Sequence, residues 1–345
     1  MSAAILIRKA PAGATLQDTG RFGWLRYGVT PAGPMDLLAH QLACRLAGHA
    51  KAATAIEVGL GGIELEAEGD TLRLGIAGGA FQVARDGEPI ATPAAVSLKP
   101  GSRLSIRAGQ SGAWVYVAPS AAFDVAPVMG SLSTHTRAAL GPLGGGLLLA
   151  GAKLPLAADR HDDWREGSVA PVPGALAESA PLVIRLVLGP QDDRFTANGL
   201  ATLVDATYTL SARSDRMAYR LEGAKLEHGA GFDIVSDGIQ FGSIQVPGDG
   251  LPLVLMADRQ PTGGYPKIAT VIRADLGALA QVRPGQSFRF VTVSVEQAVA
   301  ALRQAQHDIT GALDRLRPLG AGLDLAALAS GDYLSGWLSA TEPGP

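Results

Sequence analysis

The chain has few features of secreted or membrane proteins. Cys44 is the single cysteine among 345 residues, so an internal disulfide is impossible, as is usual in a reducing compartment. No apolar run approaches the roughly 18 residues that a membrane-spanning helix needs. Residues Met1–Arg8 lack the basic start and long apolar segment of a secretory signal peptide. We therefore expect a cytoplasmic protein outside the membrane.

The chain also lacks a large excess of charge of either sign. The 29 basic and 32 acidic residues leave a formal charge of −3, without a long run of either sign. A nucleic-acid-binding protein usually carries a basic patch or stripe, so we expect no nucleic-acid partner. Hydrophobic residues make up 47% and charged residues 18% of the chain, which excludes a disordered protein and allows a large core.

Several catalytic signatures are absent. The chain contains no Gly-x-x-x-x-Gly-Lys-Ser/Thr loop, and Gly109-Gln110-Ser111-Gly112-Ala113 fails the Gly-x-Ser-x-Gly pattern at its last position. No two of the six histidines stand four residues apart, and there is no Met-Lys-Met tripeptide. We expect no P-loop nucleotide site, no α/β-hydrolase nucleophile, no metal site and no biotin attached to this chain.

Glycine and proline are abundant, and the apolar residues follow two periods. The 44 glycines and 22 prolines favour many turns over a helical bundle. Apolar residues alternate with others at 56–58, 63–66 and 72–76, which is typical of half-buried antiparallel strands. A helical period follows Asp36, a plausible N-cap, and another follows Ser294, where Gln297 completes a capping box. The sequence predicts a mainly β protein with a few helices.

Short segments recur in the two halves of the chain. Gln82–Pro89 and Gln245–Pro252 are identical at Gln, Val, Asp, Gly and Pro, and a Pro-Gly pair recurs at 100–101 and 284–285. Segment 157–181 between the halves shows no apolar period. We expect two β lobes that arose by internal duplication. The expected divisions are residues 1–156, a linker over 157–181, a second lobe over 182–295 and a C-terminal helical segment over 296–345.

The second half carries 21 extra residues between its two recurring segments, and this insertion contains Ala257–Lys267. Added sequence on a shared scaffold often carries function. Two cations, amide and hydroxyl groups and a glycine pair are concentrated there, a combination suited to binding an anion. The alternative is a glycine hairpin with solvated charges. The candidate binding residues are Arg259, Gln260, Thr262, Gly263, Gly264, Tyr265 and Lys267.

Two further polar clusters are candidates. Ser214–Arg220 contains Asp215 beside Arg216, either of which could face a pocket, or the segment could be a turn with solvated arginines. Gly130–Arg137 concentrates hydroxyl groups, with Ser133 and Thr134 among them. These hydroxyls could bind an oxyanion, but structural capping of a turn is the commoner use of such clusters.

Together these motifs resemble the biotin-dependent carboxyltransferase family, which includes allophanate hydrolase subunit 2 and the C subunit of 5-oxoprolinase. The resemblance extends from about residue 5 to 300, and its most specific part is Asp258–Val271. The other segments that carry it are Gly20–Gly23, Gly33–Asp36, Val128–Thr134, Ser214–Met217 and Gly242–Pro247.

The resemblance implies two cyclophilin-like β-barrel lobes and a heteromeric partner related to the B subunit of 5-oxoprolinase, also called allophanate hydrolase subunit 1. In bacterial 5-oxoprolinase this pair works with a third subunit, A, to open 5-oxo-L-proline to L-glutamate at the expense of ATP. In urea carboxylase the fused equivalent transfers a carboxyl group from carboxybiotin to urea. The resemblance thus implies a small amide or lactam as substrate. It also implies ATP as a second substrate of the complex, or alternatively biotin carried on a partner protein.

The chain departs from the family pattern at a few positions. Pro261 replaces a threonine and so removes a hydroxyl and a backbone N–H, and Ala218 replaces a glycine. Ser120-Ala121-Ala122 stands where the family has a glycine pair, and Cys44 stands where it has an asparagine. These changes affect the expected substrate more than the expected fold.

The leading hypothesis is a subunit of an ATP-dependent complex resembling 5-oxoprolinase. In it Arg259, Gln260, Thr262 and Lys267 would polarise an acyl or carboxyl oxyanion, and Tyr265 would wall the pocket. Asp215 or Asp258 would orient a nitrogen leaving group, and Arg216 would hold a carboxylate. The alternatives are a carboxyltransferase that uses carboxybiotin on a partner, and a non-catalytic regulator of the B-type partner.

Overall fold

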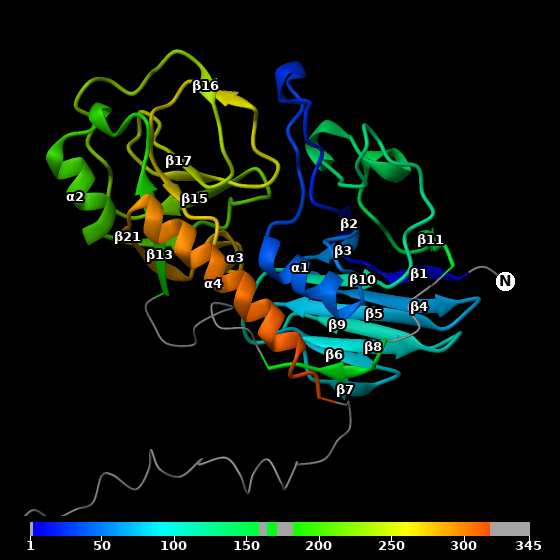
Figure 1. Ribbon diagram of the computed structural model, residues 1–345. Helices are drawn as coiled ribbons and strands as arrows, with labels where there is room; N and C mark the ends of the chain where they lie inside the picture. The colour runs from blue at the N-terminus through cyan, green and yellow to red at the C-terminus, as the bar shows by residue number, and fades with distance from the viewer. Residues whose placement is uncertain (1–2, 159–163, 171–181, 318–345) are drawn as a thin grey trace, which may run out of the picture.

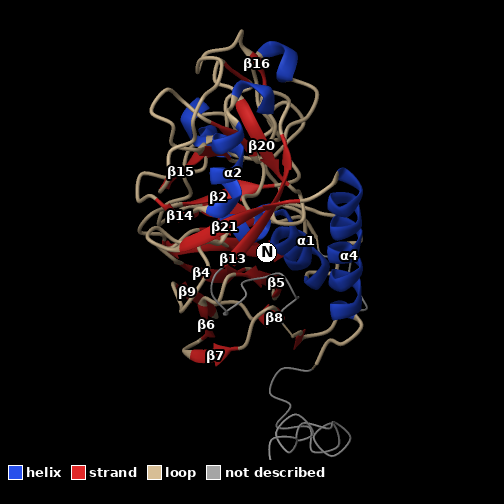
Figure 2. Cartoon of the chain, turned by 90° about the vertical axis from the view of Figure 1, so that its left-hand side faces the viewer, coloured by secondary structure: helices blue, strands red, loops and turns tan. Residues whose placement is uncertain are grey.

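The computed structural model describes residues 3–158, 164–170 and 182–317. Its strands form two lobes that lie side by side, and helix α4 (Val295–Leu313) lies across both of them (Figure 1). Helix α4 contacts α1 (Leu37–Leu46) in the first lobe and β13 (Leu182–Leu188) in the second. Figure 2 shows α1 and α4 next to each other along one side of the molecule.

The first lobe consists of two six-stranded sheets. One has the order β11-β1-β4-β9-β6-β7 and the other the order β12-β8-β5-β10-β3-β2. The strands of the first sheet are β1 (Ala4–Lys9), β4 (Ile63–Glu68), β6 (Gln82–Arg85), β7 (Glu88–Ile90), β9 (Arg103–Arg107) and β11 (Lys153–Pro155). Those of the second are β2 (Ala14–Gln17), β3 (Ala55–Val58), β5 (Leu72–Gly78), β8 (Ala94–Leu98), β10 (Val115–Pro119) and β12 (Gly167–Ser168).

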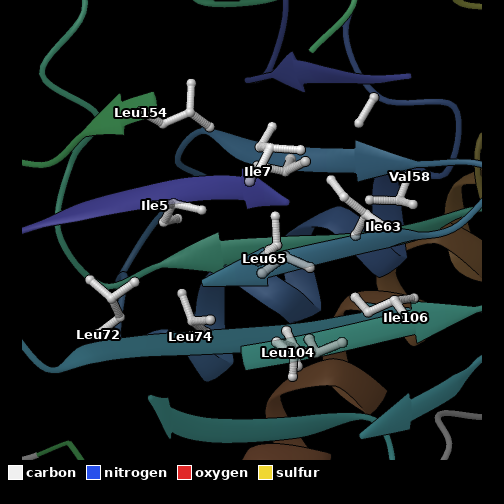
Figure 3. Packing of buried hydrophobic residues seen from close by; sticks show 14 of the residues in the cluster. Ile5, Ile7, Val58, Ile63, Leu65, Leu72, Leu74, Leu104, Ile106 and Leu154 are labelled. Carbon is white, nitrogen blue, oxygen red and sulfur yellow. The ribbon is translucent and has the colours of Figure 1, made fainter. Parts of the chain in front are cut away.

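Alternation along the strands builds the core of this lobe. On β4 every second residue is buried, including Ile63 and Leu65, while the glutamates between them face outwards. Leu65 lies among the aliphatic side chains of neighbouring strands (Figure 3). Burial of each such side chain contributes on the order of 1.5–3 kcal/mol to the free energy of folding. The outward glutamates pair with basic residues of adjacent strands; for example, Glu66 accepts from Arg8 at 2.6 Å.

Helix α1 packs closely on the outer face of the second sheet. The side chain of Asp36 caps it by accepting from the backbone N–H of Ala39 at 3.0 Å, as the sequence predicts. A Cβ atom at Gly75 on β5 would lie 2.0 Å from the backbone oxygen of Ala43, so only glycine lets the helix approach this far. The helix and its preceding loop are thereby held at a fixed place beside the second lobe.

The second lobe is a closed barrel of seven strands in the order β13-β20-β17-β18-β15-β14-β21. Strands β13 and β21 pair in parallel and the other neighbours are antiparallel. The strands after β13 are β14 (Thr207–Leu210), β15 (Ala218–Glu222), β17 (Ser243–Gln245), β18 (Leu253–Leu255), β20 (Lys267–Val271) and β21 (Ser287–Thr292). A two-stranded ribbon of β16 (Asp237–Gly238) and β19 (Thr262–Gly263) and two helices, α2 (Ala197–Asp205) and α3 (Leu276–Ala280), complete the lobe.

The expectation of a mainly β protein with a few helices is confirmed, and a β-barrel is present. The barrel closes in the second lobe, whereas the strands of the first lobe are divided between two sheets. One trace of a repeat is visible in the Pro-Gly turns. Ser102 donates to the backbone oxygen of Lys99 and Gln286 to that of Arg283, with φ of 84° at Gly101 and 85° at Gly285.

One boundary differs from the sequence-based expectation. Part of the segment expected as a linker belongs to the first lobe, because β12 pairs with β8 and Val169 is buried. The capping box at Ser294 and Gln297 is present, and the helix that it starts ends at Leu313. The remainder of the expected C-terminal helical segment, from 318 onwards, lies outside the described residues, as does much of the expected linker.

Candidate functional site

The inserted segment crosses one end of the barrel. It leaves β18, forms β19 against β16 at Thr262–Gly263, and enters β20 at Lys267. A Cβ atom at Gly263 would lie 2.7 Å from Nε2 of Gln245 and 2.8 Å from Cδ1 of Ile239, whereas one at Gly264 would meet nothing nearer than 3.4 Å. Of the glycine pair, Gly263 is therefore the one that close packing requires.

Arg259 is a buried cation with weak contacts. Its residue is 6% exposed, and its guanidinium donates only long hydrogen bonds to backbone oxygens, at 3.3 Å to Ile239 and 3.5 Å to Met256 and Ala257. The ring of Phe241 lies 5.8 Å from the guanidinium carbon. Burial lowers the pKa of Arg259 to about 10. The nearby charge of Asp258 opposes this lowering, but Asp258 is bound to Arg216. In the part of the chain that the structure describes, no carboxylate forms an ion pair with Arg259, so its guanidinium remains suited to an anion.

Lys267, the second cation of the segment, is already paired. Its Nζ donates to Oδ2 of Asp237 at 2.7 Å, and Gln191 reaches the same carboxylate oxygen at 3.3 Å. The hydrogen bond from Lys267 lowers the pKa of Asp237. Lys267 is 3% exposed. Its charge is thus neutralised at the edge of the site, unlike that of Arg259.

Asp258 and Arg216 bind each other. The guanidinium of Arg216 makes a bidentate ion pair with Asp258, at 3.0 Å from Nε and 2.9 Å from Nη2. Its Nη1 also contacts Glu57 on β3 of the first lobe, and Nη2 donates to the backbone oxygen of Gly33 at 2.7 Å. The contacts therefore place Arg216 as a link between the lobes, where the sequence suggested that it holds a substrate carboxylate.

Glu57 completes this buried cluster. It is 1% exposed and accepts from the backbone N–H of Met35 and from the hydroxyl of Tyr116, each at 2.8 Å. Burial raises the pKa of Tyr116, which keeps its hydroxyl protonated as a donor. Burial opposes the charge on Arg216, but Asp258 and Glu57 outweigh it and raise the pKa of Arg216. We call Glu57, Arg216 and Asp258 the interlobe cluster.

Asp215 lies at the exposed rim of the same contact. Its Oδ1 accepts from the backbone N–H of Met217 at 2.8 Å and of Ala218 at 3.1 Å, and its Oδ2 lies 3.2 Å from Arg137 of the first lobe. These contacts form the turn of the alternative interpretation, but Arg216 is not one of its solvated arginines, because its side chain is only 11% exposed. The contacts of Asp215 leave neither of its oxygens directed at the Arg259 loop.

Ser133 and Thr134 are buried in the first lobe rather than in the inserted loop. The hydroxyl of Ser133 donates to Asp18 at 2.6 Å, and the backbone oxygen of Thr134 accepts from Gln17 at 2.9 Å. Both residues therefore hold the segment that follows β2, in agreement with the capping alternative. Gln260, Thr262 and Tyr265 lie beside Arg259 in sequence and are exposed.

Several residues that organise these regions escape sequence analysis. Glu57, Asp18, Asp237 and Gln281 each form a key buried or charge-paired contact with a residue distant in sequence. Gln281, for example, donates to Asp36 at 2.8 Å and accepts from the backbone N–H of Ala113 at 2.8 Å, which ties the barrel to α1. None stands in a motif that would have marked it.

The departures at Pro261 and Ser120 are compatible with the fold. The backbone oxygen of Pro261 accepts from Ile239 at 3.0 Å, and the backbone N–H of Ser120 donates to Arg73 at 2.8 Å. Over the described ranges, no three His, Cys, Asp or Glu residues are grouped as metal ligands would be. Within the same ranges, no helix has both the length and the apolar character required to cross a membrane.

Known families, proteins and structures resemble the chain over most of its length. The model of the carboxyltransferase domain, subdomain A and B, matches residues 27–292. The C subunit of 5-oxoprolinase from Haemophilus influenzae is 38% identical over 291 residues, which cover 84% of this chain and 92% of that protein. The solved structure of Kluyveromyces lactis urea amidolyase superposes with a TM-score of 0.81 at 25% identity, over 89% of this chain and 20% of that chain.

A third relative is intermediate in length. The structure of TTHA0988 superposes with a TM-score of 0.73 at 30% identity, over 84% of this chain and 55% of that chain. This chain thus spans a fifth of urea amidolyase and about half of TTHA0988, but nearly all of the Haemophilus influenzae protein. On the family match and the identity to that protein, the chain belongs to the carboxyltransferase-domain family.

Proposed function

We propose that this chain is the C subunit of an ATP-dependent complex of the 5-oxoprolinase type, which opens 5-oxo-L-proline to L-glutamate. The 38% identity to a protein named as the C subunit of 5-oxoprolinase supports the assignment. The observation that carries the chemistry is Arg259, a buried guanidinium with only weak backbone contacts in the inserted loop. A lactam that also bears a carboxylate offers such a group two sites where negative charge is present or develops.

In this proposal Arg259 binds the substrate carboxylate or the oxygen of the lactam carbonyl. A preorganised donor in a water-poor site stabilises developing negative charge by about 2.7–4 kcal/mol. Gln260 and Thr262 are nearby donors in sequence, and the exposed ring of Tyr265 forms a wall. The backbone of Gly264 permits close approach, whereas Gly263 packs against the barrel. Lys267 acts from the edge, because Asp237 already holds its ammonium group.

The two aspartates take different parts. Both carboxylate oxygens of Asp258 accept hydrogen bonds from Arg216. We therefore assign Asp258 to positioning Arg259, its neighbour in sequence, and not to proton transfer. Asp215 is occupied by its own turn and by Arg137. The nitrogen leaving group would then receive its proton from a residue of another polypeptide in the complex.

The remaining parts of the reaction lie in partner proteins. A loop with one unneutralised cation suits a single carboxylate or oxyanion and is poorly matched to a triphosphate. We therefore place the ATP site on a B-type partner or on a third, A-type partner, and the lactam at the Arg259 loop. The chemistry that ATP supplies is activation of the amide oxygen.

The test is ATP-dependent formation of glutamate from 5-oxoproline by the reconstituted complex. We expect Arg259→Ala to lower kcat/KM by about 10²–10³-fold, as removal of a donor to an oxyanion does elsewhere. Arg220→Ala is a matched control, since Arg220 is an exposed arginine of the same barrel. An unchanged rate in Arg259→Ala would contradict the role of this residue. Absence of any turnover by the wild-type complex would contradict the function.

The second candidate function is transfer of a carboxyl group from carboxybiotin on a partner protein. The superposition on urea amidolyase favours it. In that case Arg259 would bind the transferred carboxylate. Depletion of biotinylated proteins on streptavidin separates the two functions, because a carboxyltransferase loses its activity on depletion and a 5-oxoprolinase keeps it.

A further inference from the structure

Among the described residues of the first lobe, the two most exposed large apolar side chains lie on one projecting segment. Residues 20–33, here called the arm, connect β2 to α1 and rise as a narrow projection beyond the sheets (Figure 1). At its tip Phe22 is 66%, Leu25 45% and Tyr27 62% exposed. Large apolar side chains that are exposed close together, rather than singly, mark a candidate interaction site.

The arm is held in place at its base. Arg21 is only 1% exposed, and its guanidinium donates to the backbone oxygens of Val128 at 2.9 Å and Ser133 at 2.8 Å. Its backbone N–H donates to Pro31 at 2.7 Å and so joins the two sides of the arm. The indole N–H of Trp24 reaches the backbone oxygen of Met129 at 3.2 Å. A fixed base means that the tip loses little conformational entropy on binding.

The tip has the composition of an interface hot spot. The rings of Trp24 and Tyr27 lie 5.9 Å apart, and the guanidinium of Arg26 stacks 4.8 Å from the ring of Tyr27. Trp, Tyr and Arg are the residues most enriched among energetic hot spots. Among the described residues Arg26 has no ion pair. The fitting partner surface is therefore an apolar pocket with an acidic rim.

A second apolar edge lies at the same end of the molecule. Phe232 is 47% and Val235 92% exposed on the loop before β16. Figure 1 shows β16 and the arm reaching the same end, opposite β7. The backbone N–H of Ile234 in this loop donates to Gly264 at 2.8 Å. The inserted loop therefore adjoins this edge.

A protein named as a subunit works with partner subunits, and such a partner is the candidate to cover this end. The superposition on TTHA0988 uses 84% of this chain but only 55% of that chain, so the rest of that chain has no counterpart in the matched part. A domain joined to its neighbour is held by high effective concentration, whereas a separate polypeptide needs an interface of roughly 1,200–2,000 Å² with strong anchors. An aromatic tip on a fixed arm supplies such anchors.

We infer that the arm, with the Phe232–Val235 edge, is the docking surface for the B-type partner, and that this partner covers the Arg259 loop when it binds. The inference rests on the proposed function for the identity of the partner. The partner would dock at the arm, and its residues would complete the Arg259 site, which is incomplete in the isolated chain.

The test is binding between the purified chain and the B-type 5-oxoprolinase partner of the same organism, measured by calorimetry and by size exclusion with light scattering. We expect the double substitution Phe22→Ser/Tyr27→Ser to raise Kd at least about 100-fold, since a few aromatic hot-spot residues carry most of the affinity of an interface. The control is Val295→Ser/Val299→Ser on α4, with side chains of similar exposure away from the arm. We expect the control to keep Kd within twofold.

Arg26→Glu tests the acidic rim separately, with an expected tenfold rise in Kd at low salt. Thermal unfolding of each variant checks that the fold is unchanged, as the exposure of these side chains predicts. Docking at the arm is refuted if wild type does not bind the B-type partner, if Phe22→Ser/Tyr27→Ser binds like wild type, or if the substitutions instead dissociate a dimer of this chain. Because binding is measured without substrate, a complex that forms through the arm without turnover refutes the proposed function alone.

Discussion

Arg216 links the two lobes with a side chain 11% exposed, and Arg259 is buried in the inserted loop, yet the surroundings of the two arginines differ. Arg216 contacts two carboxylates, Asp258 and Glu57, and a backbone oxygen. Arg259 meets three backbone oxygens at 3.3–3.5 Å. Burial of a charge is costly unless it is paired, so the first arrangement serves the fold. The weaker partners of Arg259 are the reason why we propose that it binds a ligand.

The largest expected effect comes from removing the structural arginine. Arg216→Met leaves the carboxylates of Glu57 and Asp258 buried without their cation, and such a broken pair costs about 3–5 kcal/mol. Guanidinium unfolding of the isolated chain would measure the loss. The triple variant Glu57→Gln/Arg216→Met/Asp258→Asn removes all three charges and should recover part of it. If Arg216→Met alone were as stable as wild type, the interlobe cluster would not stabilise the fold.

Substitution of Gly263 should lower stability by an intermediate amount. Gly263→Ala forces a Cβ atom against Gln245 and Ile239 at 2.7 and 2.8 Å, and overpacking of this kind costs about 1–3 kcal/mol. Gly264→Ala meets nothing nearer than 3.4 Å and should change stability by less than about 0.5 kcal/mol. Thermal unfolding of the two variants side by side makes the comparison. Equal losses would mean that the inserted loop is not packed as tightly around Gly263 as its contacts indicate.

Arg259, the arginine that we propose binds the ligand, should contribute little to the stability of the fold. Arg259→Met loses three long hydrogen bonds but removes a buried charge whose pKa burial lowers to about 10. We expect the free energy of unfolding to change by less than about 1 kcal/mol, against the larger loss in Arg216→Met. Denaturant unfolding of both variants under one set of conditions tests this difference. A loss in Arg259→Met as large as in Arg216→Met would remove the distinction between them.

The sequence predicts elements better than it predicts partners. The cap at Asp36 and the capping box at Ser294 and Gln297 are local patterns, and both are present. Alternation along β4 identifies its buried face correctly. The closure of one lobe into a barrel and the division of the other into two sheets depend on pairing between distant strands, which no local pattern specifies.

The same limit applies to the candidate site. The inserted segment marks Arg259 and Lys267 equally, but Asp237 neutralises only Lys267. The adjacent charges of Asp215 and Arg216 suggested a pocket. Their partners in the first lobe, Arg137 and Glu57, are distant in sequence, so no local pattern reveals these ion pairs. The hydroxyl of Ser133 fits an oxyanion as well as it fits Asp18. Residue type indicates what a side chain can bind, and only the three-dimensional contacts indicate which groups are already bound.

The smallest effect is expected at the exposed rim of the interlobe contact. Arg137 and Asp215 lie 3.2 Å apart across the lobes, with side chains 58% and 47% exposed. Solvent and salt weaken such pairs, and they contribute about 0.2–1 kcal/mol. Arg137→Gln should therefore cost less than about 0.5 kcal/mol and should not alter the inserted loop. A double-mutant cycle with Asp215→Asn, measured at low and high salt, gives the coupling energy. Because this pair joins the same two lobes as Arg216 and Glu57, a coupling above about 1 kcal/mol would mean that the rim as well as the buried cluster holds the lobes together.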